Sequence, residues 1–282
     1  MASASYDNPT SNCAIRCLLV LLGALIFSTS GRAETIKLGL LTCLTTECSE
    51  WGANTARGVA LAVSEINAAG GVLGKNLEVI VQDTAEASGG GGAVSALHQL
   101  ELDPGIKLFI GPTWSEAGMN LVPLMKRRAD LIITSPSLGI AAFNEGADNI
   151  FNLWPHDSTA TQTLARAAWD RGWRKIAILG SQKVWDSQQA DSFAKAFQDL
   201  GGRVLAREEP EPSTRDLRSV ALRIKEAKPD AVFFATFHLA GLGAKALAEL
   251  KYSGGKIAVL IDDSRICGWV VVPVTRQVCD RA

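Results

Sequence analysis

The chain lacks an excess of charge of either sign, because 28 lysines and arginines stand against 29 aspartates and glutamates and the formal net charge is −1. No run of basic residues interrupts this balance. Nucleic acids and anionic membrane surfaces recruit proteins through clustered lysine and arginine side chains, so we expect neither as a partner. The 282 residues are 47% hydrophobic and 20% charged, an ordinary globular composition and a length sufficient for two domains.

Signatures of metal and nucleophilic chemistry are also missing from the sequence. The three histidines, His98, His156 and His238, are scattered over different segments, and no HExxH, CxxC or paired Cys/His spacing predicts a metal site. No GxSxG motif predicts a nucleophilic serine. Residues 71–75 (GVLGK) are too short for a phosphate-binding loop. We therefore expect no metal, no cofactor and no catalytic residue, which favours a binding protein over an enzyme.

One motif favours an enzyme and keeps an alternative open. Residues 241–246 (GLGAKA) read GxGxxA, and Asp262 and Asp263 follow nearly twenty residues later, as in a dinucleotide-binding fingerprint. That fingerprint needs its first glycine directly after a strand, whereas residues 235–240 intervene here. Small residues at helical spacing explain the motif better, and an exported NAD-dependent oxidoreductase remains the alternative.

The N-terminal region carries a short apolar run. Arg16 precedes the apolar residues 17–27, and the small-residue stretch 28–33 (STSGRA) follows them. This arrangement is typical of a secretory signal peptide, and the run is shorter than the roughly 20 residues that span a bilayer. We predict cleavage after Ala33, with an uncleaved N-terminal anchor as the alternative. No other segment is long enough to cross a membrane.

Cysteine usage agrees with export. Of six cysteines, Cys13 and Cys17 leave with the leader, while Cys43 and Cys48 sit in the first loop. An oxidising compartment favours a disulfide between the latter two, although closing so short a loop contributes only about 2 kcal/mol. Two free thiols are the alternative.

Short apolar segments alternate with amphipathic ones through most of the chain. The strand candidates are Ile36–Leu40, Leu77–Val81, Leu108–Ile110, Leu131–Ile133, Ile176–Leu179, Ala231–Phe234 and Ile257–Ile261. Most are apolar throughout, which is typical of strands with helices on both faces of their sheet. Helical patterns lie between them, and Gly70 and Gly201 stand where two helices are expected to stop. Strands alternating with helices predict an α/β fold with parallel sheets.

The alternation breaks at two places. Residues 149–158 carry two aromatic residues and a proline without a clear period, and we interpret them as the crossing between two lobes. Lobe one is then 34–153 and lobe two is 154–265. Residues 266–282 lack a following helix and form an atypical tail. We expect an incomplete second lobe, whose open sheet edges and uncovered apolar surface favour aggregation.

Candidate binding residues follow the strands. In open parallel sheets, ligands bind beyond the carboxyl ends of the strands, and the loops there hold hydroxyls, backbone donors and aromatic side chains. Residues 111–118 (GPTWSEAG) follow a strand and open a helix. Ser115 is a candidate cap for this helix, whose first amides then hold an anion such as a carboxylate; a plain cap is the alternative. Residues 135–139 (SPSLG) form a similar tight turn.

Four segments are recognisable as a set: Ile36–Thr42 (IKLGLLT), Gly58–Gly74 (GVALAVSEINAAGGVLG), Phe109–Pro112 (FIGP) and Ile133–Ser137 (ITSPS). Together they resemble the type I periplasmic solute-binding proteins of ABC importers, and in particular the branch of leucine/isoleucine/valine-binding proteins. The resemblance covers about residues 36–263. It implies a two-lobed fold that closes around one small ligand. Members of this family usually continue well beyond residue 263, where this chain has its atypical tail.

The resemblance also implies ligand contacts. Ser115 matches the position where a hydroxyl and an adjacent amide bind the ligand's α-carboxylate, and Ser137 matches a backbone carbonyl that accepts from the α-amino group. Asp263, after a lobe-two strand, matches an acidic residue that pairs with the same amine. A zwitterion needs such donors at one end and an anion at the other. Gly139 stands in place of a threonine that often assists carboxylate binding.

Aromatic walls complete the implied site. Trp51, Trp185 and Phe237 occupy positions where the family often has aromatic side chains, and Trp114 adds bulk beside Ser115. Such rings suit apolar or aromatic ligand bodies. We therefore expect a periplasmic substrate-binding subunit that delivers an amino acid, an amide or an aromatic acid to the membrane subunits of an ABC permease. A ligand-sensing receptor domain of the same fold is the nearer alternative.

Overall fold

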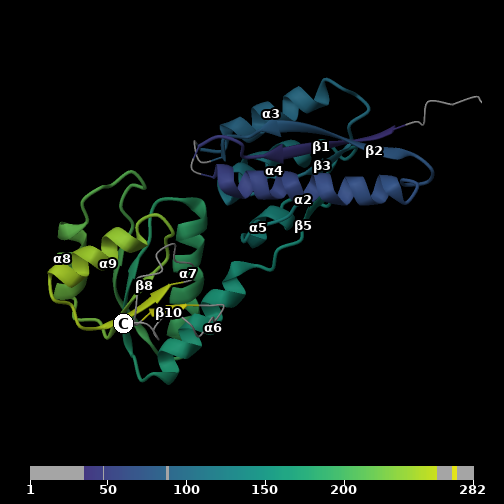
Figure 1. Cartoon of the computed structure of the whole chain (residues 1–282). Helices are drawn as coiled ribbons and strands as arrows, with labels where there is room; N and C mark the ends of the chain where they lie inside the picture. The colour runs from purple at the N-terminus through teal and green to yellow at the C-terminus, as the bar shows by residue number, and fades with distance from the viewer. Residues whose placement is uncertain (1–34, 47, 87–88, 259–268, 272–282) are drawn as a thin grey trace, which may run out of the picture.

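The computed structural model describes residues 35–46, 48–86, 89–258 and 269–271. The expected leader with its cleavage site after Ala33, and the candidate ligand residue Asp263, lie outside the described residues. The chain forms two α/β lobes, each built on one five-stranded parallel sheet (Figure 1). None of the helices described is both long and apolar enough to cross a bilayer.

Lobe one is built on the first sheet, whose strand order is β2-β1-β3-β4-β5. Its strands and helices alternate along the chain: β1 (Thr35–Thr42), α2 (Ser49–Ala68), β2 (Asn76–Asp83), α3 (Gly91–Glu101), β3 (Leu108–Ile110), α4 (Ser115–Met125), β4 (Ile132–Ser135), α5 (Ala141–Asn144) and β5 (Ile150–Asn152). Every pairing in this sheet is parallel. Figure 1 shows α2 and α3 on opposite sides of β1 and β2.

Lobe two repeats the same plan on the second sheet, with strand order β10-β9-β8-β6-β7. Its elements are α6 (Asp157–Asp170), β6 (Lys175–Leu179), α7 (Val184–Asp199), β7 (Arg203–Glu208), α8 (Arg218–Glu226), β8 (Ala231–Phe234), α9 (Ala240–Glu249), β9 (Gly255–Ala258) and β10 (Trp269–Val271). In both sheets the first strand of the lobe lies second from one edge, between the second and third strands. The two lobes therefore share one topology.

The continuous apolar strands predicted from sequence are explained by packing on both faces of the second sheet. Ala231 and Phe233 of β8 pack with buried residues of α6 and α7, whereas Val232 and Phe234 pack with those of α8 and α9. All four side chains of the strand are at most 1% exposed. A strand buried on both faces needs no polar residue, so its sequence does not alternate.

The first sheet is covered less evenly. Phe109 and Ile133 pack under α3 and α4 in a buried core. On the opposite face, Leu108, Ile132 and Phe151 lie on three neighbouring strands and are 39%, 43% and 51% exposed. Because Leu108 pairs with Ile132 and Thr134 pairs with Phe151, these three side chains point to the same side of the sheet. We call them the apolar strip.

All seven expected strands are present, the last of them described only as far as Ala258, and three further strands are described. β5 is a three-residue edge strand inside the segment that the sequence assigned to the crossing, and β7 is an edge strand with charged residues. β10 lies in the segment 266–282 that was expected to be an atypical tail, and it extends the second sheet by pairing parallel to β9.

Candidate functional site

The strand orders indicate where a ligand site is expected. In each sheet the direction of strand addition reverses between the first and third strands of the lobe, β1 and β3 in lobe one and β6 and β8 in lobe two. Open α/β sheets bind ligands outside the carboxyl ends of the strands at this reversal. Trp51, Ser115, Trp185 and Phe237 follow β1, β3, β6 and β8 respectively. The sequence therefore places its main candidate residues at the two reversal points.

Aromatic rings from both lobes meet between these points. The ring centroid of Trp51 lies 5.7 Å from that of Trp114 and 5.5 Å from that of Phe237. The Trp114 ring also lies 5.6 Å from His238, which in turn packs edge-on against Phe237 at 5.3 Å. Such distances are those of interacting aromatic pairs. Trp51, Trp114, Phe237 and His238 form what we call the ring cluster, and they join lobe one to lobe two.

A lysine adds positive charge to the ring cluster. Lys183 Nζ lies 5.1 Å from the centroid of the Trp114 ring, within the range of a cation–π contact. Lys183 also stands directly before α7, whose N-terminus carries partial positive charge. Neither Lys183 nor His238 was a candidate in the sequence, because nothing in their local pattern marks them. Their positions depend on contacts between distant loops.

The N-terminus of α4 has no side-chain cap, and one expectation about it needs correction. Ser115 is the first residue of the helix rather than its cap; the cap position belongs to Trp114, whose side chain makes no capping hydrogen bond. Ser115 is 5% exposed, and it makes no hydrogen bond through its hydroxyl to any residue in the described part of the chain. Uncapped first-turn amides and a helix dipole stabilise negative charge.

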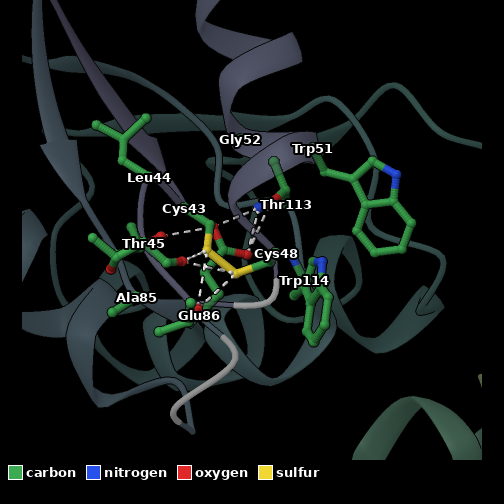
Figure 2. The surroundings of a disulfide bond; sticks show 12 residues. Cys43, Leu44, Thr45, Cys48, Trp51, Gly52, Ala85, Glu86, Thr113 and Trp114 are labelled. Atoms are coloured by element: carbon green, nitrogen blue, oxygen red, sulfur yellow. Dashed lines mark hydrogen bonds between the residues drawn. A yellow bond between two sulfur atoms is a disulfide. The ribbon is translucent and has the colours of Figure 1, made fainter. Parts of the chain in front are cut away.

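A buried carboxylate holds the loop that leads into α4. Glu86 is 1% exposed and accepts hydrogen bonds from the Thr113 backbone N–H and the Thr113 hydroxyl, both at 2.9 Å, and from the Trp114 backbone N–H (Figure 2). It also accepts from the Thr84 hydroxyl at 2.8 Å. Burial raises the pKa of the Glu86 carboxyl above its usual range, while these donors oppose the rise. The loop that carries Trp114 and Ser115 is thereby held by the segment that follows β2.

The first loop is fixed by the disulfide that the sequence left open. Cys43 and Cys48 are bonded and fully buried (Figure 2). The Thr42 hydroxyl donates to the Gly52 carbonyl at 3.1 Å, and a Cβ on Gly52 would lie 1.5 Å from the Cys43 carbonyl oxygen. Only glycine permits this approach. The start of α2, and with it Trp51, is therefore held against the end of β1.

Two of the other candidates, Gly139 and Trp185, contact Asp157, which the sequence did not single out. The Ser137 hydroxyl donates to the Thr113 carbonyl at 3.1 Å. This hydroxyl therefore connects two loops of lobe one. The Gly139 carbonyl accepts from the Asp157 backbone N–H at 2.9 Å. Trp185 is half-buried against the lobe-two core and donates its indole N–H to Asp157 at 2.7 Å. Gly139 and Trp185 thus lie beside Asp157, whereas Ser137 contacts the loop that carries Trp114 and Ser115.

Two acidic groups oppose each other where α4 and α7 meet. Burial raises the pKa of Asp186 to about 6, and the charge of Glu116 adds to this rise, whereas the Ser181 and Thr236 hydroxyls and Lys183 lower it. Asp186 is 2% exposed and accepts from the Ser181 hydroxyl at 2.5 Å. Glu116 Oε1 is buried, and the described residues supply no hydrogen-bond partner for it. This junction of the lobes is rich in acceptors.

The GxGxxA motif has a packing role. Residues 241–246 lie inside α9, several residues after β8 ends at Phe234. A Cβ on Gly243 would lie 2.3 Å from Leu179 Cδ2 and 3.0 Å from Phe234 Cε1. The glycine therefore allows α9 to approach the sheet, and it does not form the strand-to-helix turn that a dinucleotide site needs.

Comparisons with known proteins agree with the geometry. A family model described as periplasmic binding protein matches residues 35–266. A Leu/Ile/Val-binding protein of Rhizobium johnstonii is 25% identical over 82% of this chain and 62% of its own length. A leucine-, isoleucine-, valine-, threonine- and alanine-binding protein of Pseudomonas aeruginosa is 25% identical over 75% of this chain and 56% of its own. The chain thus spans about three fifths of the length of these curated relatives.

Solved structures establish the same fold. A solute-binding protein of an ABC transporter from Rhodopseudomonas palustris, in complex with 4-hydroxybenzoate, superposes with a TM-score of 0.70 at 21% identity, over 80% of this chain and 62% of that one. The branched-chain amino acid transporter substrate-binding protein of Streptococcus pneumoniae, in complex with isoleucine, gives 0.68 at 23% identity, over 80% and 64%.

Proposed function

Because the chain belongs to the periplasmic binding protein family, we propose that it is the solute-binding subunit of an ABC importer and holds one small solute between its lobes. The observation that carries the proposal is the ring cluster, in which Trp51 and Trp114 of lobe one meet Phe237 and His238 of lobe two beside the open N-terminus of α4. Binding of this kind makes or breaks no bond.

The proposed solute carries a carboxylate and an apolar or aromatic body. Ser115 and the first amides of α4 bind the carboxylate, and the ring cluster encloses the body. Amino acids, their amides and aromatic acids all satisfy this description. For an α-amino ligand, the Ser137 carbonyl and Asp263 are the proposed acceptors, and Gly139 and Trp185 border the same space.

Transport follows from the family and the expected leader. We place the mature chain in the periplasm, where lobe closure on the solute is the change that the permease subunits recognise. A sensing domain of the same fold would bind in the same way but would pass the closure to a signalling partner. The transport proposal is favoured because the two structural neighbours named above are solute-binding proteins of transporters.

A ligand screen with a matched variant pair tests the proposal. The mature chain is titrated calorimetrically with isoleucine, leucinamide and 4-hydroxybenzoate. Ser115→Ala removes a hydroxyl at the proposed carboxylate site, whereas Ser95→Ala removes an exposed hydroxyl in α3 that bonds only its own helix at Gly91. Hydrogen bonds to a charged group are worth about 1.5–3 kcal/mol, so we expect Ser115→Ala to weaken carboxylate binding about tenfold or more. Equal affinity in both variants would contradict the assignment.

A further inference from the structure

The carboxylate of Asp157 joins three parts of the molecule. Asp157 is the first residue of α6 and follows the crossing between the lobes. Its Oδ1 accepts from the indole N–H of Trp154, in the crossing, at 3.0 Å. Its Oδ2 accepts from the indole N–H of Trp185, at the start of α7, at 2.7 Å. Each carboxylate oxygen therefore holds one tryptophan in place.

Gly139 completes this junction from lobe one. Its carbonyl accepts from the Asp157 backbone N–H at 2.9 Å. A Cβ at position 139 would lie 1.7 Å from Asp157 Oδ2 and 2.4 Å from its Cγ. The backbone of Gly139 is not in the left-handed region, so its conformation suits any residue. A larger residue at this position can be accommodated only if the Asp157 carboxylate moves, because the carboxylate occupies the space where the side chain would begin.

The donors and acceptors of this junction fix the orientation of the two tryptophan rings. A carboxylate is an acceptor only, and an indole N–H is a donor only, so each tryptophan can satisfy its polar edge here in one orientation. No ion pair of Asp157 occurs among the residues that the structure describes. The negative charge is therefore held by N–H donors, and charge-assisted bonds of this type are about twice as strong as neutral ones.

We propose that Asp157 is a positioning residue for ligand binding: its carboxylate sets the orientation of the Trp185 ring and ties that ring to the crossing and to the Gly139 loop. The role in binding rests on the proposed function, because it takes the space between the lobes as the ligand site. Asp157 then has two roles: it orients the Trp185 ring in lobe two, and it bonds to Gly139 in lobe one. A change in the angle between the lobes moves Gly139 relative to Asp157, and this movement changes the orientation of the Trp185 ring.

A mutant cycle at Gly139 and Asp157 tests the contact. In the mature chain, Gly139→Ala places a methyl group on the Asp157 carboxylate and should displace it from both indoles. We expect affinity for 4-hydroxybenzoate or isoleucine to fall about tenfold or more, the loss of a charge-assisted hydrogen bond. In an Asp157→Ala background the methyl group has room, and Gly139→Ala should then change affinity less than about twofold. Gly58→Ala, on an open face of α2, is the control and should leave affinity unchanged.

A second background keeps the cycle interpretable if Asp157→Ala fails to fold. Asp157→Asn retains the size of the side chain and one acceptor oxygen, so the clash with a methyl group at position 139 persists. Gly139→Ala should therefore still weaken binding in the Asp157→Asn chain. Equal effects of Gly139→Ala in the wild-type and Asp157→Ala chains would overturn the proposal, because the loss would then not pass through the carboxylate.

A measurement without ligand separates this proposal from the proposed function. Near-ultraviolet circular dichroism reports how rigidly tryptophan rings are held. We expect Asp157→Ala and Trp185→Phe to reduce the tryptophan bands in the same region. In a chain that already carries Trp185→Phe, Asp157→Ala should reduce the bands further only through its effect on Trp154. If Asp157→Ala leaves the bands unchanged while the melt stays cooperative, Asp157 does not position the rings. If the wild-type chain binds neither probe but the bands respond as expected, the contact stands and the choice of solute is wrong.

Discussion

Asp186→Asn is the substitution whose effect the structure defines most closely. Asp186 is buried at the start of α7, accepts from the Ser181 hydroxyl, and lies near the charge of Glu116 on the facing helix α4. Asparagine has the same shape, and its amide oxygen can accept the same hydrogen bond, but it carries no charge to bury. The substitution therefore removes one ionisation and leaves the packing in place.

The magnitude follows from the pKa. Burial raises the pKa of Asp186 from 3.8 to about 6, so the folded state holds its proton more tightly than the unfolded state. A raised carboxyl pKa contributes stability that is fully present below pH 3.8 and is lost as the pH rises to about 6. Each pKa unit corresponds to about 1.4 kcal/mol, so the wild-type chain loses about 3 kcal/mol across this window. The Asp186→Asn chain should not lose it.

Urea unfolding at pH 4, 5, 6 and 7.5 measures this difference. We expect the unfolding free energy of Asp186→Asn, relative to wild type, to rise by about 2.5 kcal/mol between pH 4 and pH 7.5, with most of the rise below pH 6.5. Asp170→Asn, which changes an exposed aspartate at the end of α6, is the control. A difference that stays constant with pH would refute the reasoning, because the carboxylate would then ionise equally well in the folded and unfolded chains.

Three further outcomes follow from the described contacts. Glu86→Ala leaves two backbone N–H groups of the α4 loop without their acceptor, so we expect about 2 kcal/mol less unfolding free energy by urea titration. Opening the bond between Cys43 and Cys48 with a reductant should also cost about 2 kcal/mol, seen as a lower melting temperature. The melting temperature of a Cys43→Ser/Cys48→Ser chain, which has no disulfide to open, should not change when the reductant is added. Gly243→Ala should destabilise by about 1–3 kcal/mol because its methyl group meets the sheet, whereas Gly241→Ala, with no neighbour within 4 Å, should not.

The sequence predicted those strands that are buried on both faces of their sheet. Strands such as β6 and β8 are buried on both faces, so their residues are apolar throughout and the pattern identifies them. β7, with the sequence RVLARE, lies at an edge and keeps charged residues, and β5 has only three residues. Neither supplies enough apolar periodicity to be distinguished from a loop, and the sequence therefore assigned β5 to the crossing.

The sequence could place those candidate residues whose location depends only on their following a strand. Trp51, Trp114 and Phe237 follow strands at the reversal points, and the structure brings their rings together. Asp157 and Glu86 could not be found in this way, since their roles depend on partners 28 and 27 positions away in the sequence. A local pattern carries no information about such pairings. Ser115 was wrongly considered as a cap because hydroxyl residues favour that position, whereas the extended backbone places Trp114 there.

The apolar strip on the first sheet has a practical consequence for solution work. Leu108, Ile132 and Phe151 present three large apolar side chains side by side on one sheet face, at strand spacing. Surfaces of this kind adsorb hydrophobic dyes and detergent monomers, and they also bring chains together as concentration rises. Dye-based melts would therefore start from a high signal before any unfolding. Label-free calorimetry on dilute, detergent-free protein would measure binding of the proposed solute without interference from this face.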